Sequence, residues 1–342
     1  MPVLNELARK VPDLTAVLRT VAPPWFFDGR LELPWELSPA EQDIGCVQRG
    51  PLAIDYQETW TQHLRFQAEW ERKLSTEEQL LKARRPALVL SDIAWLPVEA
   101  AARAQVPAVA LCNLSWDQIL EPHVEADRPD QVTLLQEIRR AYGQADLMIR
   151  LTPGLVMPAF PTIADVGPVA QPATPAPPDL KRLLDIADQD RVVLIGFGGI
   201  ALESLPFERM ERMAGYQFLV SGPVPQGVRR VRSTDSIPVP FNILLATADF
   251  VMTKPGYSTI VQAVARNRPV LYVRRYNFAD EASLVQYLHR YGRGIELSAD
   301  DFHSGRWNAA LDLLGKVPVP HDAPPPATGA AEAATLLARF FP

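Results

Sequence analysis

Residues 253–259 combine glycine, hydroxyl and basic side chains in an order that suits binding of a diphosphate. The segment reads TKPGYST and lies between an apolar stretch and a helical pattern. Gly256 lets a ligand approach the backbone, while Ser258 and Thr259 offer hydroxyls beside the free amides and positive dipole end of a helix. Either hydroxyl would also suit a capping role, and both roles can hold together. The residues expected to contact a nucleotide are Lys254, Gly256, Tyr257, Ser258, Thr259 and, one turn further on, Gln262.

A glycine-rich loop at residues 196–201 is a second candidate for phosphate contact. It reads GFGGIA, follows the apolar run at 192–195 and satisfies the dinucleotide pattern G-x-G-x-x-A. A dinucleotide site also needs an acidic residue at the end of the next strand, where this chain has LVSG at 219–222. The loop therefore favours contact of Gly198 and Gly199 with a nucleotide sugar over NAD, and a tight turn without a ligand stays open.

Residues 274–281, with the sequence RRYNFADE, form a third loop after an apolar run. Asp280 and Glu281 would accept hydrogen bonds from sugar hydroxyls, or would place negative charge at a helix N-terminus. Arg274 would meet a phosphate, or would pair with surface carboxylates. The sequence leaves both alternatives open for each residue.

In the first half, Asp92 and Asp117 follow apolar runs and are candidates for a general base acting on an acceptor hydroxyl. A carboxylate after a strand is also a common helix cap, so that role stays open for both. His123 and His289 have no partner at ligand spacing and are interpreted as structural. Neither a metal-ligand pattern nor the P-loop pattern GxxxxGK[ST] is present in the sequence, so we expect no metal site and no P-loop kinase.

The elements that position these loops are short apolar runs separated by helical patterns. This alternation is typical of a parallel sheet covered on both faces, whose ligands gather at the carboxyl ends of the strands. The expected strands are 14–21, 86–92, 106–112, 146–151, 191–195, 216–220, 249–252, 269–273 and 294–297. The expected helices are 57–84 (one long helix or a broken pair), 96–104, 134–142, 180–186, 207–213, 258–265, 279–291 and 329–341.

Proline placement indicates the domain boundaries. Residues 171–178 hold four prolines in eight positions, which favours an extended linker. We expect an N-terminal Rossmann-like domain at 1–170 and a C-terminal Rossmann-like nucleotide-sugar domain at 179–320. A Pro-rich segment and a helix follow at 321–342, and a return of this helix to the first domain stays open.

The bulk composition excludes several classes of function. Hydrophobic residues make up 47% of the chain and charged residues 22%, which is typical of a globular protein. The net charge of −6 argues against nucleic acid as a partner, since phosphate backbones need a basic face. The sequence has no apolar run of membrane-spanning length and no signal-peptide pattern, so we expect a cytoplasmic protein.

The chain resembles glycosyltransferase-like proteins of the GT-B superfamily, and most of all the glycosyltransferase-like N-terminal region fused to plant L-arabinokinase. More distantly, residues 255–262 resemble the donor loop of lipid-linked N-acetylglucosaminyltransferases and UDP-glycosyltransferases. The matching stretches keep their order along the chain, which makes chance similarity a poor explanation. They are SD at 91–92, NLSWD at 113–117, IRL at 149–151, MPAF at 157–160, FGG at 197–199, KPGYST at 254–259, VRR at 273–275 and GRW at 305–307.

The resemblance implies two Rossmann-like domains facing across a cleft, a donor nucleotide held by the C-terminal domain, and no obligatory metal. It assigns the diphosphate loop to Gly256, Ser258 and Thr259 and the ribose contact to Gln262, where relatives usually carry Glu. Relatives also open with a hydrophobic strand and a Gly/His-rich loop. Residues 1–10 instead resemble the helix after that loop, so the first strand and its loop are expected to be missing or truncated.

Three functions are compatible with these features. The first is transfer of a sugar from a nucleotide-diphosphate donor, expected to be a UDP-sugar, to an unknown acceptor. The second is nucleotide-sugar binding without transfer, and the third is a nucleotide-sugar 2-epimerase of the same fold. An NAD-linked oxidoreductase is the least favoured.

Overall fold

The computed structural model describes residues 1–171, 179–198 and 205–342, which form two compact units. Unit 1 comprises residues 1–47, 55–169 and 327–342, and unit 2 comprises residues 48–54 and 170–326. Gly199, a candidate for nucleotide-sugar contact, and the proline segment 172–178 lie outside the described residues. None of the described helices is long and apolar enough to cross a membrane.

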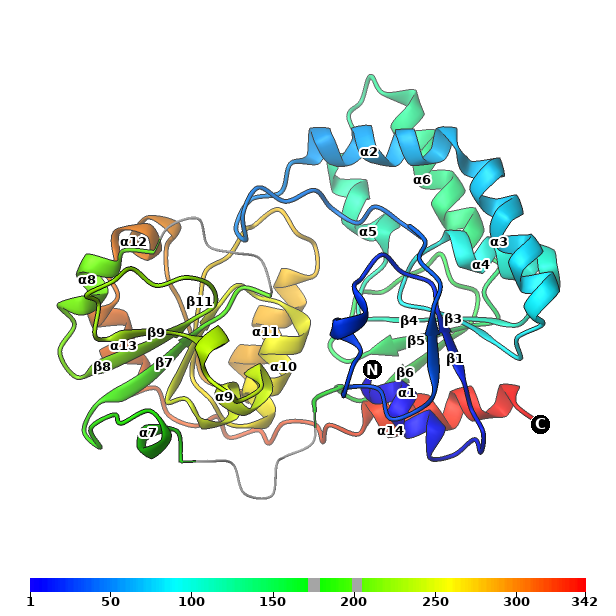
Figure 1. The fold of residues 1–342 in the computed structure, drawn as a ribbon. Coiled ribbons are helices and arrows are strands. Elements are labelled where there is room, and N and C mark those ends of the chain that lie inside the picture. The colour runs from blue at the N-terminus through cyan, green and yellow to red at the C-terminus, as the bar shows by residue number, and fades with distance from the viewer. Residues whose placement is uncertain (172–178, 199–204) are drawn as a thin grey trace. The chain divides into compact units, whose positions relative to one another are not determined.

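Unit 2 is built on a parallel sheet of six strands in the order β12-β11-β10-β7-β8-β9 (Figure 1). The strand order reverses between β7 and β10. Successive strands are added outward from β7 to β8 and β9 on one side, and from β10 to β11 and β12 on the other. Ligands of such sheets bind where the strand order reverses. The strands are β7 (Arg191–Ile195), β8 (Tyr216–Val220), β9 (Val231–Ser233), β10 (Phe250–Thr253), β11 (Val270–Tyr272) and β12 (Gly294–Glu296).

Alternate residues of these strands face two separate apolar cores. Val192 and Leu194 pack into one core and Val193 and Ile195 into the other, as the period of two in a strand requires. The first core is closed by α7 (Leu180–Leu183), α9 (Phe241–Thr247), α10 (Tyr257–Ala265) and α11 (Glu281–Tyr291). The second is closed by α8 (Phe207–Glu211), α12 (Ala299–Ser304) and α13 (Asn308–Leu314).

Unit 1 contains a parallel sheet in the order β3-β4-β5-β6 and a separate parallel pair, β1 and β2. Its main core holds the stacked rings of Trp70 and Trp95, whose centroids lie 4.0 Å apart. The strands are β1 (Ala16–Leu18), β2 (Trp35–Leu37), β3 (Val89–Ser91), β4 (Ala108–Cys112), β5 (Leu147–Leu151) and β6 (Ile163–Val166). The helices are α1 (Pro2–Ala8), α2 (Tyr56–Ala68), α3 (Trp70–Arg84), α4 (Leu96–Ala104), α5 (Trp116–Leu120) and α6 (Pro129–Tyr142).

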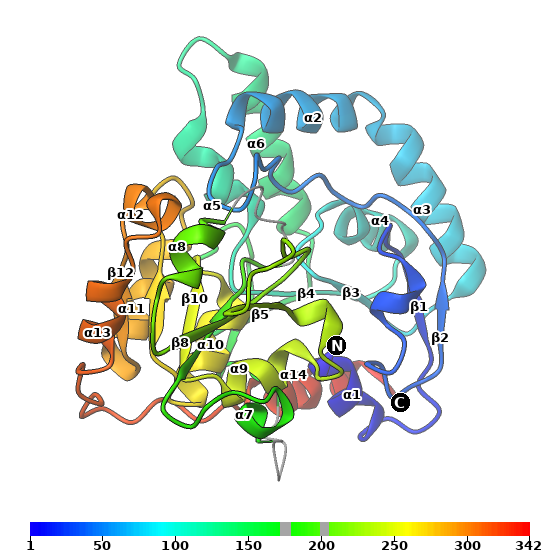
Figure 2. The same ribbon diagram turned by 60° about the vertical axis from the view of Figure 1, so that its left-hand side comes forward.

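The last helix, α14 (Gly329–Leu337), belongs to unit 1 and packs against α1 (Figures 1 and 2). The N–H of Gly167 donates to the Glu332 carboxylate over 2.7 Å. A Cβ atom on Gly329 would lie 1.9 Å from the carbonyl oxygen of Gly167, so only glycine fits there. The chain therefore enters unit 2 for residues 170–326 and comes back to finish unit 1.

The predicted α/β class with parallel sheets is confirmed, and the expected broken helix pair is α2 followed by α3. The expected strand at 14–21 is shorter and pairs only with β2 within the described residues, outside the four-stranded sheet. Among the elements that the structure describes, seven short α-helices and strands were not predicted: β2, β6, β9, α5, α9, α12 and α13. None of these segments has a long apolar pattern with the period of a helix or of a strand.

Candidate functional site

The loops after β7 and β10 lie together at the point where the strand order of unit 2 reverses. Met252 pairs with Ile195 in the parallel register, and the N–H of Gly196 donates to the carbonyl of Met252 over 3.0 Å. Residues 196–198 and residues 253–259 therefore leave the sheet side by side. The ordinary ligand position of this sheet type is formed by the two loops that the sequence singled out.

Gly196 and Gly198 are required for different reasons. A Cβ atom on Gly196 would lie 2.6 Å from the ring of Phe241, so this glycine makes room for that ring. Gly198 has a φ of +73°, a conformation that favours glycine, and it is exposed. A Cβ atom there would lie 3.8 Å from the Nζ atom of Lys254. Gly198 is thus the member of the pair that faces the predicted site.

Lys254 brings a cation to this point, although only 9% of the residue is exposed. Burial above all, and then the charge of Arg275, lower the pKa of Lys254 to about 8. The nearby carboxylates of Glu281 and Asp280 act in the opposite direction. A desolvated lysine beside a glycine loop gains much from a phosphate, because an anion returns the electrostatic stabilisation that burial has removed.

Gly256 is the N-cap residue of α10 and, as a glycine, has no side chain with which to cap that helix. Helix geometry leaves the first amides of α10 without partners inside the helix, and their dipoles favour an anion. Gly256 has an ordinary φ of −122°, and the nearest atom to an added Cβ would be the Lys254 carbonyl oxygen at 3.9 Å. Neither backbone strain nor packing requires glycine at position 256. A side chain there would instead occupy the free space above the first amides of α10.

The remaining residues at the start of α10 differ in exposure. Ser258 is exposed and Thr259 is partly exposed, so both hydroxyls are accessible, whereas Tyr257 packs partly against the core beneath. Gln262 donates from Nε2 to the carbonyl of Ser258 over 3.1 Å. Its side chain thus folds back toward the start of the helix, the direction that a ribose contact would need.

The Glu281 side chain accepts hydrogen bonds from residues of its own loop. Its carboxylate is fully buried and accepts hydrogen bonds from Nε of Arg275 at 2.6 Å and from the backbone N–H of the same residue at 3.0 Å. The N–H of Tyr276 adds a third bond at 3.4 Å. These bonds anchor the loop between β11 and α11, which supports the structural alternative for Glu281 over a sugar contact.

The neighbours of Glu281 complete this loop. Asp280 is 4% exposed and forms the N-cap position of α11 without a side-chain cap bond among the described residues. The guanidinium of Arg274 lies 4.6 Å from the ring centre of Tyr276, and its Nε atom lies 3.9 Å from the Glu281 carboxylate. Arg274 is partly exposed and is better placed than Arg275 to reach an anion.

In unit 1, Asp92 follows β3 and part of its surface is open to solvent. Packing around the carboxyl group raises the pKa of Asp92, against the opposing effects of the Met1 amino group and a hydrogen bond with Cys112. Burial and the Asp92 charge in turn raise the pKa of the Cys112 thiol, which is therefore neutral. A carboxyl with a raised pKa on a partly exposed residue suits a general base.

Asp117 has a different environment, because it is completely buried. Its carboxylate accepts a 2.6 Å hydrogen bond from the Ser115 hydroxyl and lies 3.3 Å from Nε of Arg139. A group with this burial and these partners positions α5 against α6 and has no open path to a substrate. We therefore retain Asp92 alone as the candidate base.

Asp43 is a neighbour of Asp92 that sequence analysis missed. Its Oδ2 atom accepts a 2.8 Å hydrogen bond from Nε1 of Trp116. Burial raises the pKa of Asp43 and the charge of Asp92 adds to the rise, while the Trp116 bond lowers it. No local motif marks Asp43, since packing of α5 alone brings Trp116 to it.

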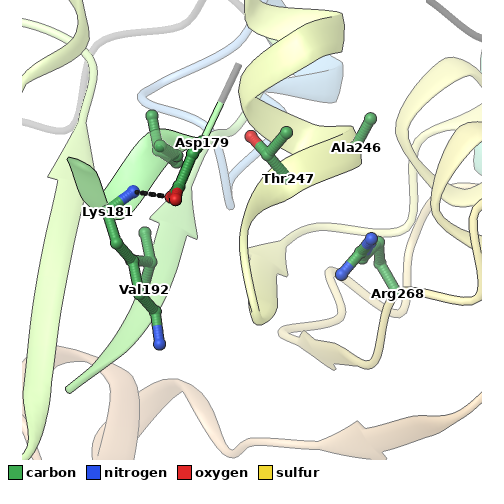
Figure 3. A pocket seen from close by; sticks show the side chains of 7 residues that line it. Asp179, Lys181, Val192, Ala246, Thr247 and Arg268 are labelled. Carbon is green, nitrogen blue, oxygen red and sulfur yellow. Dashed lines mark hydrogen bonds between the residues drawn. The ribbon is translucent and has the colours of Figure 1, made fainter. Parts of the chain in front are cut away.

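Figure 3 shows a pocket of about 250 Å³ elsewhere in unit 2. It lies at the amino ends of β7, β10 and β11, where Val192, Thr247 and Arg268 line it. Asp179 caps α7 there by accepting from the N–H of Lys181. The predicted loops leave the opposite, carboxyl edge of the sheet, so this pocket is separate from the candidate site.

Known proteins resemble this chain in sequence and in fold. L-arabinokinase of Arabidopsis thaliana is 26% identical over 312 residues, which cover 86% of this chain and 28% of that protein. The chain thus spans little more than a quarter of this curated relative. No family model matches the chain.

Among solved structures, the calicheamicin glycosyltransferase CalG4 matches with a TM-score of 0.60 and 20% identity, covering 99% of this chain and 89% of that one. A UDP-glucosyltransferase from Polygonum tinctorium, capable of glucosylating indoxyl, matches with a TM-score of 0.60 and 14% identity over 99% of this chain and 95% of that one. The chain has the GT-B glycosyltransferase fold, as the sequence resemblance implied.

Proposed function

We propose that this protein transfers a sugar from a nucleotide-diphosphate donor, a UDP-sugar, to a hydroxyl acceptor. The observation that carries the proposal is the open N-terminus of α10 beside the partly desolvated Lys254, at the strand-order reversal of a GT-B fold. Both features favour a diphosphate. UDP-using neighbours of the same fold support the choice of nucleotide.

In the proposed complex the amides of Ser258 and Thr259 and the ammonium of Lys254 hold the diphosphate. Gln262 reaches the ribose hydroxyls. During transfer the bond between the sugar C1 atom and the phosphate oxygen breaks, and the electron pair leaves with UDP. Lys254 and the α10 dipole stabilise that charge.

The second half of the reaction forms the bond from C1 to the acceptor oxygen. Asp92 takes the proton of the acceptor hydroxyl as this bond forms, so the products are the glycoside, UDP and a protonated carboxyl. No step in this scheme needs a bound metal, because the cationic charge comes from Lys254 and the helix terminus.

Calorimetry and a product assay test the proposal. We expect UDP to bind without added metal and NAD to fail to compete with it. Incubation with UDP- and GDP-sugars and a pool of hydroxyl acceptors should release nucleoside diphosphate. Preferential NAD binding would reject the proposal. UDP binding without transfer or hydrolysis of any donor would leave the sugar-binding alternative, and C2 inversion of the donor would indicate the epimerase.

A further inference from the structure

Unit 1 contains a pocket of about 380 Å³ at the carboxyl ends of the β1–β2 pair. This volume is near the lower end of the range for small-molecule sites. The pocket is formed by the segments that follow the two strands and by one side chain of α2. Its lining residues are Arg19, Thr20, Val21, Ala40, Glu41, Gln42, Asp43, Ile44 and Gln62.

One wall of the pocket is rigidly held. Arg19 donates from Nε to Glu77 over 3.1 Å and from Nη2 to the same carboxylate, which is 6% exposed. Its Nη1 atom donates to the carbonyl and hydroxyl oxygens of Ser38 at 2.9 and 2.7 Å. Arg19 therefore links the end of β1 to α3. It lines the pocket, but its guanidinium is already paired with Glu77 and Ser38.

Gln42 is the unusual member of the lining. Both its amide nitrogen and its amide oxygen are withdrawn from solvent, and neither has a hydrogen-bond partner among the described residues. Buried polar atoms are nearly always paired, because leaving one unpaired is costly. A ligand that donates one hydrogen bond and accepts another would satisfy this amide once the side chain turns toward the pocket.

Asp43, the next residue, provides a second polar group in the same wall. Trp116 orients its carboxylate through the 2.8 Å hydrogen bond, and the ring of Trp116 lies 3.4 Å from where a Cβ of Gly45 would stand. Burial, together with the charge of Asp92, raises the pKa of Asp43. A carboxylate fixed in this way accepts hydrogen bonds from hydroxyl groups.

We propose that this pocket binds a hydroxyl-rich small molecule, a free sugar or a sugar alcohol, as the acceptor in the transfer. The inference rests on the proposed function and names its acceptor class. Sugar hydroxyls donate and accept, as Gln42 and Asp43 together require, while Val21 and Ile44 offer apolar contact to the C–H face of a ring. None of the nine lining residues is aromatic, which disfavours a flat aromatic acceptor.

The test measures binding to the full chain by saturation-transfer NMR and calorimetry, without any donor. The probes are a panel of neutral aldohexoses, aldopentoses and inositols, with 1-naphthol as the flat aromatic comparison. The variants are Gln42→Leu and Asp43→Asn. The matched controls are Gln57→Leu, at an exposed position of α2, and Asp13→Asn, at an exposed loop position.

We expect one or more of the sugars or inositols to bind, and each pocket variant to weaken that binding at least about tenfold. The controls should keep the affinity of the unmodified protein. Gln42→Leu should melt at the same or a higher temperature, because it removes two unpaired buried polar atoms. Loss of sugar affinity in a protein of undiminished stability is a result that a merely structural Gln42 would not produce.

Failure of the whole panel to bind, or 1-naphthol binding that depends on Gln42, would overturn the inference. UDP affinity, measured in parallel, separates this result from the proposed function. Sugar binding without UDP binding would reject the transferase proposal and keep the pocket. UDP binding and donor turnover without sugar binding would keep the transferase proposal and reject the acceptor class.

Discussion

The Nζ atom of Lys254 lies 3.8 Å from the position that a Cβ atom of Gly198 would occupy. Gly198, which follows β7, and Lys254, which follows β10, thus lie on either side of one small volume, and Gly198 has a left-handed backbone conformation. A diphosphate held in that volume would touch both loops. Each of the first three predictions follows from this arrangement.

Lys254→Met should weaken UDP binding at least about tenfold, since one charge-assisted hydrogen bond is worth roughly 1.5–3 kcal/mol. The fold should persist, because methionine fills a similar volume without a buried charge. Calorimetry compares this variant with Lys181→Met, which removes a lysine at the opposite edge of the same sheet. An equal loss of affinity in both variants would show that general charge, rather than the site, matters.

UDP affinity should fall as pH rises from 7 to 9. Burial and the Arg275 charge lower the pKa of Lys254 to about 8, so the ammonium is largely present below pH 7 and largely lost at pH 9. Glu281 and Asp280 oppose this shift but do not cancel it. Lys254→Arg keeps its charge throughout the range and should flatten the profile. A profile that is unchanged in that variant would assign the titration to another group.

Gly256→Val should weaken UDP binding at least about a hundredfold, because its side chain would hold the diphosphate away from two or three amides. The melting temperature should hardly change, since φ is −122° and an added Cβ would meet nothing closer than 3.9 Å. Gly256→Ala should give a smaller loss of affinity. Unaltered affinity in the valine variant would remove the α10 terminus from consideration as the donor site.

Glu281→Ala should lower the free energy of unfolding by about 3–5 kcal/mol, because it leaves a buried arginine without its partner. The Arg275 side chain is 4% exposed and depends on the Glu281 carboxylate. Urea unfolding measures the change, with Glu208→Ala on exposed α8 as the control. A small stability loss together with a large loss of donor binding would restore the sugar-contact role of Glu281.

Asp92→Asn should lower turnover, whereas Asp117→Asn should lower stability. The first should reduce turnover by roughly 10²–10⁴ and leave UDP affinity nearly unchanged. The second should mainly reduce stability, because Arg139 and the Ser115 hydroxyl lose the carboxylate that they bind. Initial rates and thermal melting separate the two. Intact turnover in Asp92→Asn would require another base, and Asp43, whose pKa is also raised by burial, is the next candidate.

The donor-side features were predictable because they are local in sequence. The expected strand at 191–195 has the bounds of β7, since four apolar residues, 192–195, run unbroken into a glycine. The same holds for the helix at 96–104, which is α4. The motif at 253–259 contains strand end, glycine and helix start within seven residues, so its chemistry could be recognised without knowing any tertiary contact.

Features that depend on distant contacts could not be predicted. Asp43 receives its hydrogen bond from Trp116, 73 residues away, and neither residue carries a local signal for the other. Glu281 fits both a sugar contact and a loop anchor by sequence, and only the positions of its three donors favour the anchor. Edge strands such as β9, with the sequence VRS, are too short and polar to stand out.

The return of α14 to unit 1 has a consequence for biosynthesis. Unit 1 needs residues 327–342, which the ribosome makes only after every residue of unit 2. α1 therefore waits for a packing partner that is synthesised only after the whole of unit 2. Until α14 emerges from the exit tunnel, the buried face of α1 with Val3 and Leu7 has no cover from that helix, so nascent chains stalled before residue 327 should be the ones that chaperones hold.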